Sequence, residues 1–68
     1  MHEQLNNRLR EERVRRDFTQ AQLAELIGVS RKTINTVENG VFIPSTVLAL
    51  RLARALDTTV EALFELPE

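Results

Sequence analysis

The sequence predicts an all-α domain, a compact bundle of five short helices over residues 1–68. Three observations favour this class. Apolar residues recur every three or four positions through most of the chain, which is the spacing of one helix face. Serine or threonine precedes the later apolar stretches, as at helix N-caps. The 68 residues include only two glycines and two prolines, which leaves little room for β turns.

The size and composition of the chain exclude several classes of protein. A chain of 68 residues buries a small core, so its stability depends on regular packing or on a partner subunit. Because it has no cysteine, disulfides and thiolate metal sites are excluded. We expect His2 to be solvated, and we predict neither a metal site nor a cofactor. No apolar run approaches the roughly 20 residues of a membrane span, and no export signal is visible. We therefore expect a cytoplasmic protein without a membrane or small-molecule partner.

The net charge of −1 does not by itself indicate a nucleic-acid partner, but the charges are unevenly distributed. Residues 1–40 hold seven basic and six acidic side chains, and residues 41–68 hold two basic and four acidic ones. Acidic pairs such as Glu11 and Glu12 have no nucleophile or histidine beside them. The chain also lacks a glycine-rich phosphate loop. We therefore predict that it is not an enzyme.

Two helices are expected in the first part of the chain. The first covers about residues 3–16, with Leu5 and Leu9 on one face and charged residues elsewhere. The second, Gln20–Ile27, begins under Thr19, which opens a capping box with the glutamine three residues later.

A glycine stop separates the second helix from the third. Gly28 can adopt the positive φ that ends a helix, at no steric cost. Ser30 caps the third helix, which continues to Glu38. Asn39-Gly40 then ends it with a second left-handed turn.

The last part of the chain is expected to hold two more helices after a loop at Val41–Pro44. They cover Thr46–Leu56, with Ser45 as the cap, and Val60–Glu65, with Thr58 or Thr59 as the cap. The fourth helix carries more apolar residues than one core-facing stripe requires. This excess indicates either a thoroughly buried central helix or a dimer patch formed with the C-terminal segment. The residues expected in such a dimer interface are Val47, Leu48, Phe64 and Leu66.

The third helix has one apolar and one polar face. Ile34 and Val37, three residues apart, share its buried stripe. Arginine and lysine can donate to guanine, asparagine can pair with adenine N6 and N7, and threonine offers a methyl or a hydroxyl to a base edge. The polar residues expected to contact bases in the major groove are Arg31, Lys32, Asn35 and Thr36. At the start of the second helix, Gln20 and the free amides beside it are expected to hold a phosphate.

Short segments along most of the chain stand at a spacing typical of one family. They are Phe18-Thr19-Gln20, Leu23-Ala24, Ile27-Gly28-Val29-Ser30, Thr33-Ile34, Val37-Glu38-Asn39-Gly40, Pro44-Ser45 and Leu52-Ala53-Arg54-Ala55-Leu56. In these segments the chain resembles the phage-repressor/Cro-like (Xre) helix-turn-helix family. The resemblance implies a lambda-repressor-like DNA-binding fold, with the helix-turn-helix in the second and third helices.

The resemblance also implies roles for single residues. It implies an ion pair between Arg13 and Glu38 that ties the first helix to the third. It supports base contacts from Arg31, Lys32 and Thr36, and it places Gln20 and Asn39 on phosphates. The full set of phosphate contacts that we expect is Gln20, Thr33 and Asn39.

The sequence departs from the family pattern at two places. Glu12 stands on the apolar stripe of the first helix, where the family often has leucine. Since a buried unpaired carboxylate would cost several kcal/mol, we expect it to reach solvent, Arg16 or Arg8. The segment Val41-Phe42-Ile43 is apolar where the family tends to have lysine or arginine. Any phosphate contact from this segment would therefore come from its backbone N–H groups.

Two functions remain open on the sequence. The first is a sequence-specific transcriptional regulator, expected to be a repressor, that binds a near-palindromic site on double-stranded DNA as a homodimer. The alternative is a protein-interaction module, such as an antitoxin or adaptor, that uses the same scaffold. The near-neutral charge and the apolar segment around Phe42 favour this alternative slightly.

Overall fold

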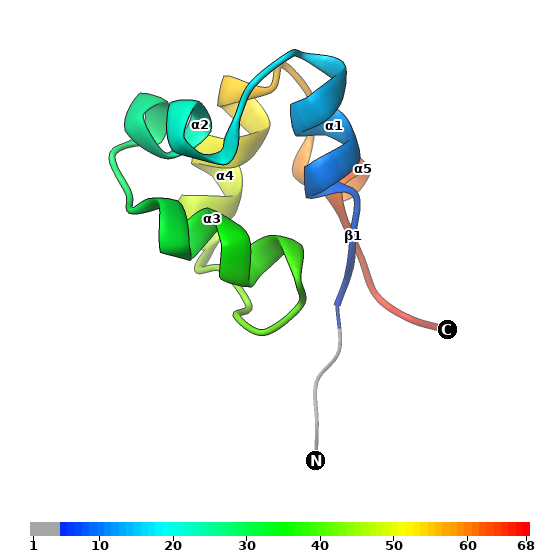
Figure 1. Ribbon diagram of the computed structural model, residues 1–68. Helices are drawn as coiled ribbons and strands as arrows, with labels where there is room; N and C mark the ends of the chain where they lie inside the picture. The colour runs from blue at the N-terminus through cyan, green and yellow to red at the C-terminus, as the bar shows by residue number, and fades with distance from the viewer. Residues whose placement is uncertain (1–4) are drawn as a thin grey trace.

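The computed structural model describes residues 5–68 and has five helices and two short strands within them (Figure 1). The helices are α1 (Leu9–Arg15), α2 (Gln20–Ile27), α3 (Arg31–Glu38), α4 (Thr46–Ala55) and α5 (Val60–Leu63). The strands are β1 (Asn6–Asn7) and β2 (Phe64–Glu65). The predicted helical bundle is confirmed, with a two-stranded ribbon added to it. None of the helices in residues 5–68 has the length and apolarity needed to cross a membrane.

The start of the chain differs from the prediction. We expected one helix over residues 3–16, but β1 precedes α1, which begins only at Leu9. Asn7 explains this boundary, because its Oδ1 accepts a hydrogen bond from the Leu9 N–H (3.2 Å) and its Nδ2 donates to the Val37 carbonyl (3.1 Å). Asparagine favours such local bonds over the helix interior. His2 and residues 3–4 lie outside the described residues.

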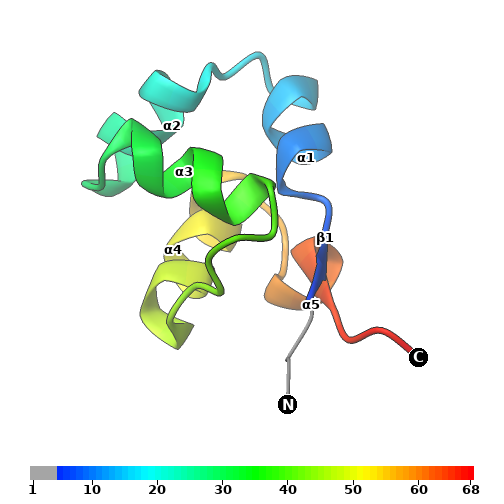
Figure 2. The same ribbon diagram turned by 60° about the horizontal axis from the view of Figure 1, so that its bottom comes forward.

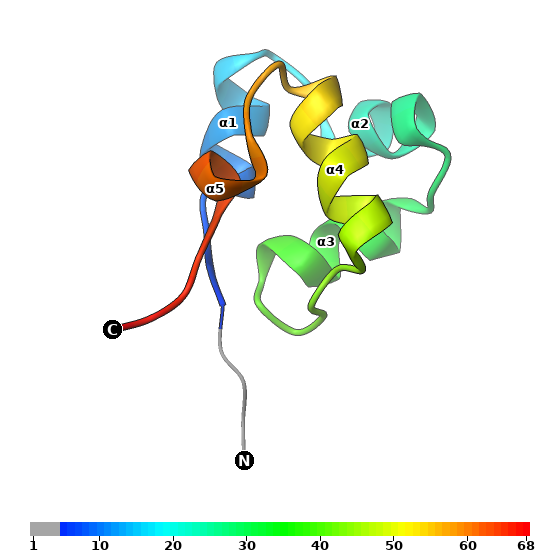
Figure 3. The ribbon, with the colours of Figure 1, turned by 180° about the vertical axis from the view of Figure 1, so that it is seen from behind.

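The end of the chain also differs, because the last helix stops at Leu63 rather than Glu65. The two following residues are extended and form β2, which pairs antiparallel with β1. Asn6 lies opposite Glu65, and Asn7 lies opposite Phe64. Figure 3 shows these two segments side by side below α1 and α5. The ribbon therefore joins the two ends of the described chain.

The helix boundaries between these ends follow the predicted capping residues. Helices α2 to α5 each begin after a hydroxyl that accepts a main-chain N–H, at distances of 3.0–3.1 Å. These caps are Thr19, Ser30, Ser45 and Thr59. Gly28 and Gly40 have positive φ values of 77° and 72°, as predicted for the two glycine turns. Asp17 and Asp57 also have positive φ, which the sequence analysis did not predict.

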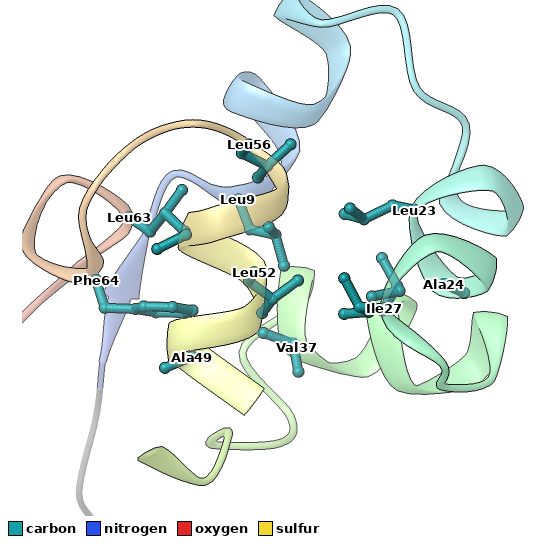
Figure 4. Packing of buried hydrophobic residues seen from close by; sticks show 12 residues of the cluster. Leu9, Leu23, Ala24, Ile27, Val37, Ala49, Leu52, Leu56, Leu63 and Phe64 are labelled. Atoms are coloured by element: carbon teal, nitrogen blue, oxygen red, sulfur yellow. The ribbon is translucent and has the colours of Figure 1, made fainter. Parts of the chain in front are cut away.

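Helix α4 runs through the centre of the apolar core (Figure 4). Its buried face packs between the side chains of α2 and those of Leu9, Leu63 and Phe64. The burial of each large apolar side chain stabilises the fold by about 1.5–3 kcal/mol. However, Val47 and Leu50 on the same helix are exposed. The expectation of a thoroughly buried central helix is therefore wrong for this face.

Candidate nucleic-acid interface

A short turn sets the relative position of α2 and α3. Gly28 ends α2 in the left-handed conformation, and the N–H of Val29 donates to the Ala24 carbonyl at 2.9 Å. Ala24 is buried in the cluster that also holds Ile34 and Val37 of α3. A larger side chain at this position would push the two helices apart. The back of α3 is thus held by apolar packing.

The opposite side of α3 carries polar side chains, and no other element covers this helix in Figure 2. Arg31, Lys32 and Asn35 are exposed, and Thr36 is half-buried. Within residues 5–68, neither Arg31 nor Lys32 makes an ion pair or a side-chain hydrogen bond. Two positive charges at the first turn of an exposed helix are available to contact phosphates or guanine edges.

Behind this face lies the buried carboxylate of Glu38, whose side chain is 0% exposed. Arg13 donates to it from Nε (2.6 Å) and Nη2 (3.3 Å), so the ion pair implied by the family resemblance is present. Arg10 Nε donates at 3.3 Å and Gln20 Nε2 at 3.1 Å. The carboxylate therefore joins α1, α2 and α3 at one point.

The pKa of the Glu38 carboxyl reflects both its burial and these donors. Burial alone raises the pKa, and this is the largest single influence. The hydrogen bonds from Arg13, Gln20 and Arg10, together with the positive charge of Arg13, outweigh it. The pKa consequently lies below its ordinary value of 4.5, and the group is ionised at neutral pH.

Of the predicted contact residues, Gln20 and Asn39 both donate a hydrogen bond to Asn35. Asn35 Oδ1 accepts from Gln20 Nε2 (3.2 Å) and from Asn39 Nδ2 (3.1 Å). Asn39 Oδ1 accepts from Arg10 Nη2 at 2.8 Å. The structure thus brings these three residues together at the edge of the polar face. In doing so it engages both Nε2 protons of Gln20 within the protein.

The two predicted threonine contacts are also engaged in local bonds. Thr36 Oγ1 donates to the Thr33 carbonyl at 3.0 Å, so its hydroxyl proton points back into the helix. Thr33 Oγ1 lies 3.0 Å from Ser30 Oγ. Thr36 therefore offers a methyl group and an acceptor oxygen rather than a donor.

Arg10 also belongs to the hydrogen-bond network around Glu38, although the sequence alone did not indicate this role. Arg10 and Arg13 lie three residues apart, which places them on one side of α1. Both point to Glu38 on α3. This spacing was the available signal, but it becomes informative only when the position of Glu38 is known.

Comparison with known proteins identifies the family of this chain. A helix-turn-helix family model matches residues 9–63. The chain belongs to the Cro/C1-type (Xre) helix-turn-helix family. It is 36% identical over 64 residues to the uncharacterized HTH-type transcriptional regulator YgzD of Bacillus subtilis (strain 168), covering 94% of this chain and 97% of that protein. It is therefore a DNA-binding transcriptional regulator and not an enzyme.

Two further relatives agree with this assignment. An uncharacterized HTH-type transcriptional regulator of Methanothermobacter thermautotrophicus is 46% identical over 61 residues, with 88% of each chain covered. The restriction-modification controller protein C.AhdI from Aeromonas hydrophila has a similar structure, with a TM-score of 0.77 and 40% identity. That match covers 81% of this chain and 83% of C.AhdI.

In the apolar segment after α3, two backbone N–H groups form hydrogen bonds within the protein. The N–H groups of Val41 and Phe42 both donate to the Thr36 carbonyl, at 2.9 and 3.2 Å. These bonds close the end of α3. The N–H groups of Val41 and Phe42 are therefore already engaged within the protein, while their side chains are exposed.

Glu12, the other departure from the family pattern, is paired with arginines at the C-terminal end of α1. Its carboxylate oxygens lie 3.4 Å from Arg16 Nη1 and 3.4 Å from Arg15 Nη1. Arg16 was one of the two expected partners. The other, Arg8, instead forms an ion pair with Glu65 at 3.3 Å, across the β ribbon.

The residues predicted for a dimer interface occupy different environments. Val47 is 59% exposed and Leu66 is 72% exposed, while Leu48 is half-buried. Phe64 is only 8% exposed, because it packs inside the protomer's own core. This corrects the expectation that Phe64 is available for a dimer interface. An open groove lined by residues of α4, α5 and the C-terminal segment includes Leu50, Phe64 and Leu66.

Proposed function

We propose that this regulator binds a near-palindromic operator as a homodimer and acts as a repressor in the cytoplasm. In this proposal α3 enters the major groove of double-stranded DNA, and Arg31, Lys32, Asn35 and Thr36 contact bases. The observation that supports it most is the contrast between the two sides of α3. Its back is packed in the core, while Arg31 and Lys32 are exposed and make no ion pair within residues 5–68.

Phosphate contacts fix the position of α3 in this proposal. The first N–H groups of α2 have no acceptor within their helix, so those at Gln20 and Ala21 suit a phosphate oxygen. Gln20 therefore contributes to phosphate binding through this main-chain N–H, while its side-chain Nε2 keeps its bonds to Glu38 and Asn35. Asn39 Nδ2 retains one proton beyond its bond to Asn35. Thr33 contributes a hydroxyl near the same end of α3 as Lys32.

A second copy of the chain is the proposed occupant of the groove beside α4 and α5. The exposed side chains of Leu50 and Leu66 line this groove, and Val47 is exposed on the same helix as Leu50. All three would be covered in a two-fold interface. Two α3 helices related by such an axis would reach successive major grooves about 34 Å apart. Occupation of a promoter by this dimer would exclude other proteins, which is the simplest form of repression.

The test is selection of bound sequences from a random duplex pool, using protein whose oligomeric state is measured by sedimentation equilibrium. A near-palindrome with half-site centres about one helical turn apart is the expected product. Affinity for random duplex DNA should also fall steeply with salt, because bound phosphates release counterions. An enriched single half-site bound by a monomer would contradict the dimer. Enrichment without reduced transcription from a reporter promoter would contradict repression.

The alternative of a protein-interaction module is supported by one observation, the exposed apolar side chains of Val41, Phe42 and Ile43 beside α3. A surface of this kind is unusual next to a strongly polar DNA site. The same salt titration separates the two functions. An antitoxin or adaptor without its own DNA activity would show almost no duplex binding at any salt concentration.

A further inference from the structure

The hydrogen-bond network around Glu38 determines which end of the Asn35 carboxamide faces away from the protein. We propose that Asn35 presents only its Nδ2 donor to DNA and therefore selects a base with acceptors on its major-groove edge, guanine before thymine. This inference rests on the proposed function, because it assigns a base preference within the same site. It replaces the adenine pairing expected from the sequence.

The direction of every bond in the network follows from its charged members. The ionised carboxylate of Glu38 can only accept, so the Gln20 group that faces it must be the NH₂ group. Arg10 can only donate, so the Asn39 atom that faces Arg10 must be the oxygen. Glu38 thus fixes the orientation of the Gln20 side-chain amide, and Arg10 fixes that of Asn39.

The orientation of Asn35 then follows from its two neighbours. Gln20 Nε2 lies 3.2 Å from Asn35, and Asn39 Nδ2, turned away from Arg10, lies 3.1 Å from the same atom. Both neighbours are donors, so this atom must be the acceptor, Oδ1. Reversing the Asn35 amide would place donor against donor twice. The Nδ2 group of Asn35 makes no hydrogen bond within residues 5–68 and lies on an exposed residue.

A fixed donor distinguishes between the bases. Adenine is read by asparagine through two bonds, one of which needs the amide oxygen as acceptor for N6. That oxygen is already engaged with Gln20 and Asn39. Guanine presents two acceptors, N7 and O6, and thymine presents O4. Cytosine presents only the N4 donor and is the least suitable of the four bases.

The position of Asn35 on α3 allows this contact. Successive residues of a helix are about 100° apart, so Asn35 lies between Arg31 and Lys32 when viewed down the axis. Both neighbours are themselves donors without acceptor capacity. The three side chains together form a surface that only donates, which matches a guanine-rich half-site.

The orientation is tested first in the free protein, by NMR of the side-chain amides in ¹⁵N-labelled full-length chain. We expect slow solvent exchange for the Gln20 and Asn39 NH₂ protons that are hydrogen-bonded, and fast exchange for both Asn35 NH₂ protons. Protected Asn35 protons would overturn the inference without any reference to DNA.

The base preference is tested by selection from a random duplex pool with the wild type, Asn35→Ala and Asn35→Asp. We expect Asn35→Ala to lose preference at one base pair of each half-site, by about fivefold or more. Asn35→Asp keeps an oxygen for Gln20 and Asn39 but presents no donor, so preference there should move toward cytosine. Lys32→Ala is the control, and it should change the base preference at a different position of the half-site.

The results separate this inference from the proposed function. A G·C pair at the position controlled by Asn35 supports the preference for guanine. An A·T pair at that position, or no position that responds to Asn35→Ala, would overturn the inference while leaving a DNA-binding regulator. If the wild type enriches no sequence, the proposed sequence-specific function fails, and the base preference fails with it.

Discussion

Arg13 and Glu38, 25 positions apart in the chain, meet at 2.6 Å between Nε and Oε2 and tie α1 to the end of α3. The same guanidinium donates from Nη1 to the Phe18 carbonyl at 2.7 Å and so also holds the connection between α1 and α2. Because the Glu38 side chain is fully buried, its charge depends on these donors rather than on water. The pair supports the DNA-facing surface from behind.

Replacing Arg13 by methionine should lower the free energy of unfolding by about 3 kcal/mol at pH 7. The loss arises because the buried carboxylate keeps only its bonds to Arg10 and Gln20. Urea denaturation followed by circular dichroism, at one protein concentration, measures it. Arg15→Met is the matched control on the same helix, since Arg15 is largely exposed in its pair with Glu12 and should contribute at most about 1 kcal/mol. Equal losses in the two variants would contradict a special role for Arg13.

The lowered pKa of Glu38 predicts a specific dependence of stability on pH. The unfolded chain binds a proton at this carboxyl more readily than the folded chain does. The contribution of Glu38 to the free energy of unfolding is therefore complete above the ordinary pKa of 4.5. It is lost as the pH falls through the lower pKa of the folded state. Unfolding free energies of the wild type and Glu38→Gln, measured from pH 7 to pH 3, should differ most at pH 7 and converge in acid. A constant difference would show that ionisation of Glu38 is not the cause.

Most of the helical fold was predictable because its signals are local. The Ser and Thr caps and the two glycine turns act within a few residues, and the structure has them where the sequence indicated. The β ribbon was not predictable in this way. It depends on the pairing of Asn7 with Phe64, which are far apart in the sequence, so no local pattern indicates it. In the candidate site, the exposure of the polar face of α3 could be predicted from periodicity. The hydrogen-bond network around Glu38 could not, because it depends on the relative positions of α1, α2 and α3.

Arg31→Ala should weaken binding to the selected operator by about 1–3 kcal/mol and relax the choice of base at one position. The reason is the loss of a charged donor that has no ion pair within residues 5–68. Fluorescence anisotropy with the operator and with single-base variants measures both effects. Arg51→Ala removes the same charge from an exposed residue of α4 and serves as control. If the two variants lost equal affinity, and sequence preference stayed intact, Arg31 would not contact a base.

Val47→Glu should convert the proposed dimer to a monomer and weaken operator binding, while leaving the helical content unchanged. The side chain is 59% exposed in the protomer, so a charge there does not disturb the core. In the proposed interface, however, it would be buried against a second apolar surface. Sedimentation equilibrium and circular dichroism measure the two properties. Leu26→Glu, on an equally exposed leucine of α2, is the matched control and should remain dimeric.

The β ribbon has a mechanical consequence for the domain. Because β1 and β2 are antiparallel, residues 5 and 66 leave the ribbon at the same end. Tension applied at residues 5 and 66 would load the hydrogen bonds of the ribbon one after another rather than all at once. The bond from the Arg8 N–H to the Leu63 carbonyl would be the last to break before force reached α1 and α5. Force applied through these positions would therefore separate β1 from β2 while the helix-turn-helix stayed folded.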